Sequence, residues 1–214
     1  MHTAAAPWSG LPAEVRAEFV SRGRRLHFKR RQIVYDHGEA PSGIYWVVSG
    51  LVGMVILGRS GTEHLLRFFR PTQVFGHRAI FAAETYHGRT LVLEDCELAF
   101  VPTACVSWAL DHHPAMHRAA LRQLAKELRR AEQHWVEMLE HEVTPRVAGA
   151  LIYLQAIDPG HAWTRQEIAN FCASTVATVI RALKQLEHQG LVRQQGRRLE
   201  IVDRARLLAL AHED

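Results

Sequence analysis

The spacing of apolar residues changes along the chain, and the first change separates a short helix from a region of strands. Val15, Phe19 and Val20 recur at helical spacing among charged residues, which predicts an amphipathic helix over residues 11–25. From residue 26 to about residue 102, short apolar stretches alternate with glycine-bearing turns, a pattern typical of antiparallel strands in a barrel or sandwich. The expected strands cover residues 32–35, 43–48, 51–57, 64–69, 74–76, 89–93 and 98–101, with a turn at Ser49-Gly50.

A long helix is predicted next, because the chain between Pro114 and Glu142 contains no glycine or proline and is rich in strong helix formers. Its apolar residues recur in steps of three and four, as do the a and d positions of a heptad repeat. The expected seam consists of Leu121, Leu124, Leu128, Ala131, Trp135 and Met138. We expect this seam to pair with the same helix of a second chain in a parallel dimer. The alternative is that it packs on its own β-domain, and both arrangements can hold for different parts of the helix.

The chain after Thr144 is expected to be helical again, with a small hairpin near its end. Thr164 and Glu167 have the spacing of a capping box, and Gly190 is a C-terminal helix stop. The predicted elements are helices over residues 146–156, 164–172, 175–189 and 204–211, and strands over residues 191–194 and 198–202. A helix, a tight turn, a second helix and a hairpin in this order describe a winged helix-turn-helix.

The second helix of such a motif places its N-terminal half in the major groove of DNA. Hydroxyl groups there can reach phosphates or base edges, small apolar side chains can touch thymine methyl groups, and arginines can bind guanine or phosphate. The expected DNA-binding residues are Arg165, Ser174, Thr175, Val176, Ala177, Thr178, Arg181, Arg197 and Arg198. For Arg165 a solvated surface role is an equal alternative. For the whole motif, the alternative is a module that contacts protein within a larger complex.

Composition narrows the function class only slightly. The 214 residues carry a net charge of +4, which is compatible with nucleic-acid binding. The three cysteines form no CxxC pair, and neither a signal-peptide core nor a bilayer-length apolar run is present, so we expect a cytoplasmic protein without a membrane anchor. The sequence contains no nucleophile-and-base set and no glycine-rich phosphate loop, so we do not expect an enzyme.

Short motifs along most of the chain occur in a specific order. They include Gly38-Glu39, Gly43-Ile44-Tyr45, Val48-Ser49-Gly50, Val74-Phe75-Gly76, Leu93 to Leu98, Thr164 to Ala169, Val179, Arg181, Leu183-Lys184, Leu186-Glu187 and Gly190-Leu191-Val192. Over residues 26 to 210 the chain thereby resembles the cyclic-AMP receptor protein and fumarate–nitrate reductase regulator (CRP/FNR) family.

The resemblance implies an α+β fold with three parts. These are an antiparallel β-roll of the cyclic-nucleotide-binding jelly-roll type with a short N-terminal helix (1–110), a long dimerisation helix (111–142) and a winged helix-turn-helix domain (143–214). It also implies an allosteric homodimer on a two-fold symmetric double-stranded DNA site, with RNA polymerase as a partner and an effector in the β-roll.

The chain departs from the family's cyclic-nucleotide site at three places. Gly76-His77 stands where the family has Gly-Glu, Tyr86-His87 where it has Arg-Ser, and Ala131-Glu132 where it has Thr-Ser. Because a cyclic phosphate loses its arginine partner, we expect no tight binding of cyclic AMP, unless Arg89 takes that role. The residues expected around the effector are Gly76, His77, Arg78, Tyr86, His87, Arg89, Ala131, Glu132 and Trp135.

Three alternatives remain for the sensory domain, whose effector is unknown. Haem-based gas sensors of this family take an axial histidine from this region, so His77 could bind haem; otherwise it is a core or rim histidine. A non-haem effector that uses His77, and a regulator that needs no ligand, are the other two. An iron–sulfur cluster of the family's type is not expected, because no cysteine precedes Cys96. No metal site is expected at the histidine pair His113 and His117.

Overall fold

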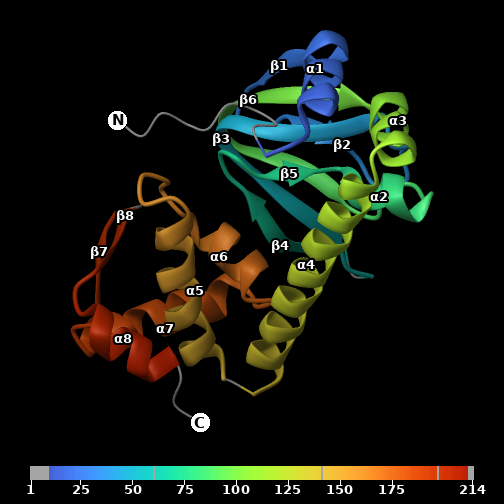
Figure 1. The fold of residues 1–214 in the computed structure, drawn as a ribbon. Helices are drawn as coiled ribbons and strands as arrows, with labels where there is room; N and C mark the ends of the chain where they lie inside the picture. Colours follow the sequence, from blue (N-terminus) through green and yellow to red (C-terminus); the bar gives the residue numbers. More distant parts are fainter. Residues whose placement is uncertain (1–9, 60, 141, 197, 212–214) are drawn as a thin grey trace. The chain divides into compact units, whose positions relative to one another are not determined.

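The computed structural model describes residues 10–59, 61–140, 142–196 and 198–211, with backbone alone over 137–140 (Figure 1). Two residues expected at functional sites, Arg197 and the side chain of Met138, lie outside the described part. The chain divides into two compact units, which we describe separately. The first holds residues up to Leu57 together with Leu66–Ala125, and the second holds Gly58–Leu65 together with the chain from Lys126 onward.

The first unit is built on one sheet, and the expected α+β class with an N-terminal β-domain is confirmed. Its strands are β1 (Arg24–Phe28), β2 (Ile33–Tyr35), β3 (Gly43–Leu57), β4 (Glu63–Phe69), β5 (Val74–Phe75) and β6 (Arg89–Pro102). The order is β1-β6-β3-β4, and β2 pairs with β6 and β5 with β3. The pairs of β6 with β1, β2 and β3, and the pair of β5 with β3, are antiparallel.

One predicted turn is wrong and two expected strands are joined into one, because β3 and β6 are continuous strands. The predicted turn at Ser49-Gly50 is a bulge, where the register of β3 against β6 shifts between Val47 and Leu51. Gly50 has φ +84°, and a Cβ added there would lie 2.3 Å from the carbonyl oxygen of Asp95. A glycine in this pattern therefore bends a strand rather than ending it. The predicted break between residues 93 and 98 is likewise absent from β6.

Helices α1 (Ala13–Arg22) and α3 (Thr103–His112) pack against an apolar face of the sheet formed by β3 and β6. Helix α1 buries Val15 and Phe19 against α3, as the helical spacing predicted for α1. The basic stretch after α1 is strand β1 rather than the end of a helix, because Leu26 and Phe28 pack against the core. Neither α3 nor α2 (His77–Ala82) was predicted; α2 begins where Gly76, at φ +86°, ends β5.

The long helix α4 (Pro114–Glu140) follows α3 and has nearly the predicted bounds. It is continuous and contains the boundary between the two units. None of the helices that the structure describes combines the length and the hydropathy of a bilayer-spanning segment.

The second unit contains the predicted winged helix-turn-helix. Its elements are α5 (Val143–Ile157), α6 (Arg165–Phe171), α7 (Val176–His188), β7 (Val192–Gln195), β8 (Arg198–Ile201) and α8 (Arg204–Ala211). Fully buried side chains from four helices form its core, among them Leu154, Ile168, Leu183 and Leu207. The antiparallel pair β7–β8 is the wing. Most bounds agree with the predicted ones to within two residues, but α5 begins three residues earlier than predicted.

Candidate nucleic-acid interface and effector region

Side-chain caps fix the start of both helices in the helix-turn-helix. The predicted capping box is present: Glu167 N donates to Thr164 Oγ1 at 3.1 Å, and Thr164 N donates to Glu167 Oε2 at 2.8 Å. Thr175 caps α7 by accepting a hydrogen bond from Thr178 N at 3.2 Å. Between the helices, Ser174 N donates to Ala169 O at 3.0 Å. These bonds hold the turn in one conformation and set the direction of α7.

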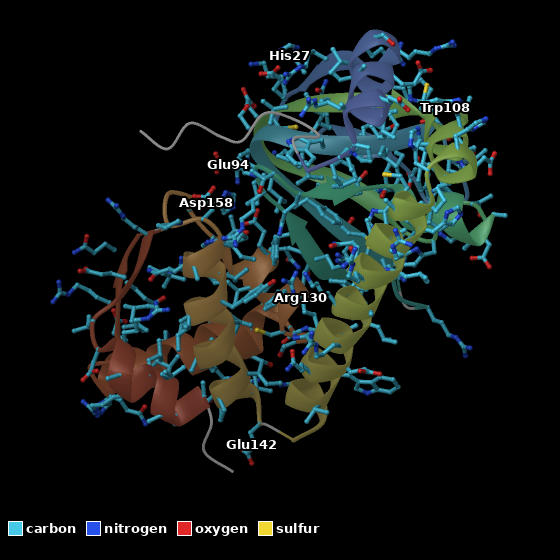
Figure 2. All side chains as sticks on the ribbon, viewed as in Figure 1. His27, Glu94, Trp108, Arg130, Glu142 and Asp158 are labelled. Carbon is cyan, nitrogen blue, oxygen red and sulfur yellow. The ribbon has the colours of Figure 1, made fainter. Side chains whose placement is uncertain are left out.

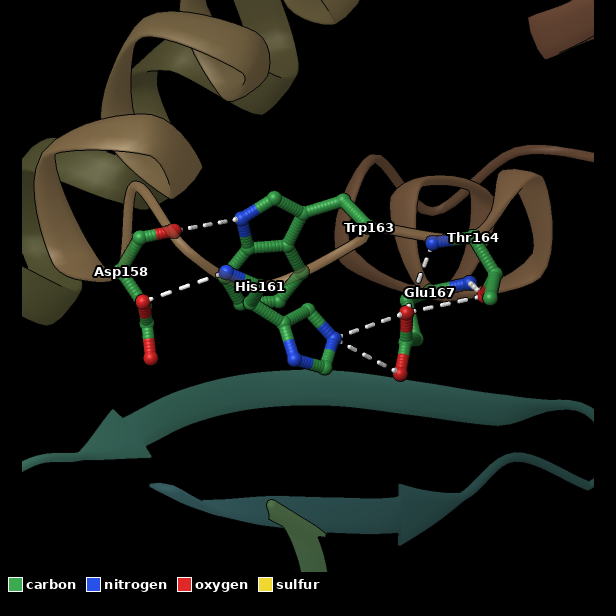
Figure 3. A network of polar contacts seen from close by, with 5 residues as sticks. All are labelled: Asp158, His161, Trp163, Thr164 and Glu167. Carbon is green, nitrogen blue, oxygen red and sulfur yellow. Dashed lines mark hydrogen bonds and ion pairs between the residues drawn. The ribbon is translucent and has the colours of Figure 1, made fainter. Parts of the chain in front are cut away.

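A buried histidine reinforces the first cap, as Figure 3 shows. His161 Nε2 lies 3.3 Å from both carboxylate oxygens of Glu167, and the histidine side chain is fully buried. Trp163 and His161 pack edge to face, with ring centroids 4.3 Å apart, and Trp163 Nε1 donates to Asp158 O. Burial of Glu167 opposes its ionisation, but the hydrogen bonds from His161 and Thr164 hold the pKa of this carboxyl below its usual value.

The exposed face of α7 brings together most of the residues predicted to bind DNA. Val179, Ala182, Leu183 and Leu186 turn into the core. Thr175, Ala177 and Arg181 are exposed, whereas Ser174, Val176 and Thr178 are half-buried. Thr175 Oγ1 and Thr178 Oγ1 lie 2.9 Å apart, and Arg181 Nη2 donates to Thr178 Oγ1 at 3.1 Å. The polar side chains at the N-terminal half of α7 therefore form one connected, outward-facing row.

Sequence reasoning missed one apolar residue on this helix. Ile180 is 40% exposed and lies one turn after Val176 and Ala177. The exposure of Ile180 was predictable from helical spacing. Residues three and four apart share a helix face, and Val176 and Ala177 were expected to face the DNA. The three side chains give α7 an apolar strip beside Arg181, which is a surface suited to thymine methyl groups.

The wing and α6 hold the remaining predicted residues. Arg198 is exposed on β8. Arg165 is half-buried, and its Nη2 donates to Gln194 Oε1 at 2.8 Å, so this arginine is fixed against the wing rather than freely solvated. Arg193, also on the wing, pairs with Glu200 at 3.4 Å, and both side chains are more than half exposed.

The apolar stripe of α4 is largely uncovered within one chain. Leu121, Leu128 and Trp135 follow each other at intervals of seven and are 67%, 61% and 67% exposed. Ala131 is exposed as well, whereas Leu124 is half-buried. Val136, next to Trp135, adds a further exposed apolar side chain. The predicted seam is therefore an open surface along most of its described length.

The interior of the β-domain is filled at the place where sequence comparison put the effector. Tyr86 is 3% exposed and stacks on Tyr35 with ring centroids 3.6 Å apart, and its hydroxyl donates to Gly43 O at 3.2 Å. Burial raises the pKa of Tyr86 to about 12, so both rings are neutral. The cavity beside them has a volume of about 20 Å³ and is lined by Tyr35, Met54, Gly76, Arg78, Ala79, Tyr86, His87 and Gly88. This is room for about one water molecule, whereas small-molecule sites measure about 300–1,000 Å³.

The basic residues at and beside this cavity have different surroundings: Arg78 and His87 line it, and Arg78 is exposed, whereas Arg89 follows Gly88. Arg89 binds Asp36 with two hydrogen bonds, of 3.0 and 2.8 Å, and these hold the pKa of Asp36 below its usual value. A cyclic phosphate would therefore compete with a carboxylate for this arginine. His87 is exposed at the rim, where partial burial and the charge of Arg78 lower its pKa.

His77 is a core residue of the first unit. It is buried at the start of α2, and its ring packs on Phe81 with centroids 5.5 Å apart. The small cavity next to Gly76 and Arg78 is far too small for a haem, so this arrangement does not fit that group. The other three residues expected at the effector, Ala131, Glu132 and Trp135, are exposed on α4 in the second unit, and their part in an effector site stays a prediction.

The remaining candidate chemistry has structural explanations. Cys96, Cys105 and Cys172 are free and buried, and burial raises the pKa of each thiol, which opposes reactivity. Trp108, which Figure 2 labels, lies on α3 and stacks on His112 with ring centroids 5.4 Å apart. Within the described residues, His, Cys, Asp and Glu form no cluster of three or more that could hold a metal ion.

Comparison with known proteins agrees with this two-part architecture. A model of the cyclic nucleotide-binding domain matches residues 25–113, and a model of the Crp-like helix-turn-helix domain matches residues 145–210. The solved structure of FixK2 from Bradyrhizobium japonicum has the same fold, with a TM-score of 0.78 and 24% identity over 90% of this chain and 98% of that chain.

Two curated relatives align along most of their length. The transcriptional regulator LdrP of Thermus thermophilus is 30% identical over 189 residues, which is 84% of this chain and 93% of LdrP. A CRP-like cAMP-activated global transcriptional regulator of Mycobacterium tuberculosis is 28% identical over 210 residues, covering 94% of this chain and 93% of that protein. The relatives are transcription regulators and not enzymes. The chain thus belongs to the CRP/FNR family of DNA-binding transcription regulators.

Proposed function

We propose that this regulator is a cytoplasmic homodimer that binds a two-fold symmetric DNA site under the control of its β-roll, with RNA polymerase as a further partner. In this proposal residues 1–110 are sensory, residues 111–142 dimerise and residues 143–214 bind DNA. The observation that carries it is the exposed apolar stripe of α4, formed by Leu121, Leu128 and Trp135 at heptad spacing.

The stripe is a strong argument for self-association. Burial of one leucine side chain contributes about 1.5–3 kcal/mol, so two copies of a stripe with two leucines and a tryptophan supply a substantial driving force. A heptad repeat pairs in register with a copy of itself, which gives a parallel pair related by a two-fold axis. Two helix-turn-helix domains in such a dimer address half-sites about one helical turn of DNA apart.

The dimer is tested by Leu128→Glu, which places a carboxylate in the centre of the stripe. Gln133→Glu is the matched control, because it adds the same charge at an exposed position of α4 off the stripe. Light scattering measures the mass: we expect the wild type and the control at twice the chain mass of 24.3 kDa, and Leu128→Glu at one chain mass. A Leu128→Glu protein that stays dimeric contradicts the seam.

For the DNA-binding domain, we propose direct base contacts from the row on α7 and phosphate contacts from Arg165, Arg197 and Arg198. The support is the exposed position of Thr175, Ala177 and Arg181 on α7. The cap at Thr175 and the buried side chains of α7 fix the direction of this helix. Val176 and Ala177 carry no hydrogen-bonding group, so we propose that they contribute apolar contacts to the operator.

For the sensory domain, we propose an effector other than cyclic AMP. The buried Tyr35–Tyr86 stack and the engagement of Arg89 by Asp36 support this, because a cyclic nucleotide needs both volume and an arginine for its phosphate. The second candidate is a regulator that needs no ligand. The same filled interior favours it, since a packed core gives a fixed structure to the β-domain without a bound molecule.

A further inference from the structure

Three polar side chains from three elements meet between the helix-turn-helix and the wing. Arg165 opens α6, Glu187 lies near the end of α7, and Gln194 lies on β7. Arg165 Nη2 donates to Gln194 Oε1 at 2.8 Å. Gln194 donates in turn to Glu187, from its backbone N to Oε1 at 2.6 Å and from Nε2 to Oε2 at 2.9 Å.

These contacts fix the glutamine in one orientation. Its amide has an acceptor end and a donor end, and the acceptor faces a guanidinium whereas the donor faces a carboxylate. The reversed amide would place a donor against Arg165 and an acceptor against Glu187, which loses both side-chain bonds. Gln194 is half-buried and the bond to Arg165 spans 29 positions of the chain, so the arrangement depends on the packing of the wing against α6 and α7.

A neutral amide suits the positioning of an arginine that must bind something else. A guanidinium presents its N–H donors in a planar fork, so one fixed acceptor sets the plane of the whole group. A carboxylate in the place of Gln194 would neutralise the charge and compete with a DNA phosphate. The amide accepts a hydrogen bond from Arg165 and carries no charge of its own, while Glu187 binds the amide.

We propose that Gln194 is a positioning residue, which holds Arg165 in place for a DNA phosphate and couples the wing to α7. This inference rests on the proposed DNA contact of Arg165. Gln194 does not touch DNA in this role, and it acts through the arginine. We call the hydrogen-bonded set of Arg165, Gln194 and Glu187 the relay. The relay also links the wing to the C-terminal end of α7, whose N-terminal half is proposed to read the bases. The wing and α7 therefore move as one body.

The number of phosphate contacts is measured by the salt dependence of DNA binding, because each contact releases counterions and adds about 0.9 to the slope of log K against log salt. This term does not depend on base sequence, so a mixed-sequence duplex of about 30 base pairs is a suitable probe. Fluorescence anisotropy of the labelled duplex gives affinity and slope for the full-length protein. Thermal unfolding of each variant reports stability separately.

For each protomer of the proposed dimer we expect Arg165→Gln to weaken binding about tenfold and to lower the slope by about 0.9, which is about 1.8 for the dimer. Gln194→Leu keeps the approximate size of the side chain but removes both hydrogen bonds of its amide group. We expect it to lower the slope as well. In the double variant the slope falls no further than in Arg165→Gln alone, because the two residues act on one contact. The matched control is Gln195→Leu at the adjacent exposed position, which leaves the slope unchanged.

A rescue variant separates positioning from wing stability. In Glu187→Gln with Gln194→Glu the two side chains exchange chemistry, and every bond retains a donor and an acceptor: Gln at 187 donates to Glu at 194, which accepts from Arg165. We expect this pair to restore the thermal stability lost in Gln194→Leu but not the slope, because the carboxylate neutralises Arg165 and competes with phosphate.

The outcomes distinguish the inference from the function on which it rests. A wild-type protein without salt-dependent DNA binding contradicts the proposed function. If Arg165→Gln lowers the slope but Gln194→Leu lowers only thermal stability, the positioning role is overturned while DNA binding stands. If Arg165→Gln has no effect on a salt-dependent wild type, Gln194 has no phosphate contact to position, and the inference is likewise overturned.

Discussion

The side chains on the open face of α7 are the residues that we propose to read the bases of the operator. Arg181 has the charge to bind guanine or phosphate, and its bond to Thr178 holds it along the helix. Val176, Ala177 and Ile180 have no hydrogen-bonding group and form a strip beside it. We therefore expect polar and apolar readout from neighbouring turns of one helix.

Arg181→Ala is predicted to cost about 1–3 kcal/mol of binding free energy if the arginine reads a base. The operator is first selected from a random pool by the wild-type protein, and affinity is then measured on it and on single-base variants. The variant should lose discrimination at one position of each half-site. Arg204→Ala, at an exposed position of α8, is the control for loss of a positive charge. Unchanged affinity and unchanged discrimination in Arg181→Ala would remove this residue from the interface.

Ile180→Ala is predicted to weaken binding by about 1 kcal/mol, because it removes apolar surface from the contact with thymine methyl groups. Replacing single thymines of the operator with uracil removes the methyl group from the DNA side. The wild type should lose affinity at one such position, and Ile180→Ala should be insensitive there. Equal sensitivity of both proteins to every uracil would show that Ile180 does not contact a methyl group.

Within elements, local signals predicted the helix-turn-helix well and the β-domain less well. The capping box at Thr164 and the glycine stop at Gly190 act within a few residues, so they were readable before any packing was known. The bulge at Gly50 and the start of α2 after Gly76 depend on the partner strand, and glycine alone did not distinguish a bend from a turn. The Arg165–Gln194–Glu187 relay joins elements distant in sequence, and no sequence pattern indicated it.

The capping box predicts how the stability of the DNA-binding domain depends on pH. The folded-state pKa of Glu167 is below its usual value, so its ionisation stabilises the fold fully above the unfolded-state pKa of about 4.3. This contribution is lost as pH falls through the lower folded-state pKa. Glu167→Gln should lower the free energy of unfolding by about 1 kcal/mol near neutral pH, and the difference from wild type should shrink as the pH falls below about 5.

Urea unfolding at several pH values measures this difference. Glu200→Gln is the control, because the exposed pair of Glu200 with Arg193 contributes little at any pH. A constant difference between wild type and Glu167→Gln over the whole range would mean that the carboxylate charge is not what stabilises the cap.

For the whole molecule, the α4 stripe and the interior of the β-domain have opposite characters. The stripe leaves large apolar side chains exposed, whereas aromatic rings fill the interior of the β-domain. The seam was predictable because it is a repeat within one helix. The filled interior was not, since Tyr35 and Tyr86 are far apart in sequence, and the sequence indicated only that Tyr86 stands where the family has an arginine. We therefore propose that this chain departs from cyclic-AMP-dependent relatives in signal reception.

Thermal unfolding in the presence of candidate effectors tests that departure directly. A ligand at about a hundred times its Kd adds roughly 2.7 kcal/mol to the free energy of unfolding, which is a clear rise in melting temperature. We expect no rise with excess cyclic AMP or cyclic GMP, because the cavity of about 20 Å³ holds neither and Asp36 competes for Arg89. A duplex that the wild type binds serves as the positive control for the assay. A rise with cyclic AMP that Arg89→Gln abolishes would instead show that the tyrosine stack opens and that Arg89 binds the phosphate. A rise with haem alone that disappears in His77→Ala would make His77 an axial ligand, in contradiction to its assignment as a core residue.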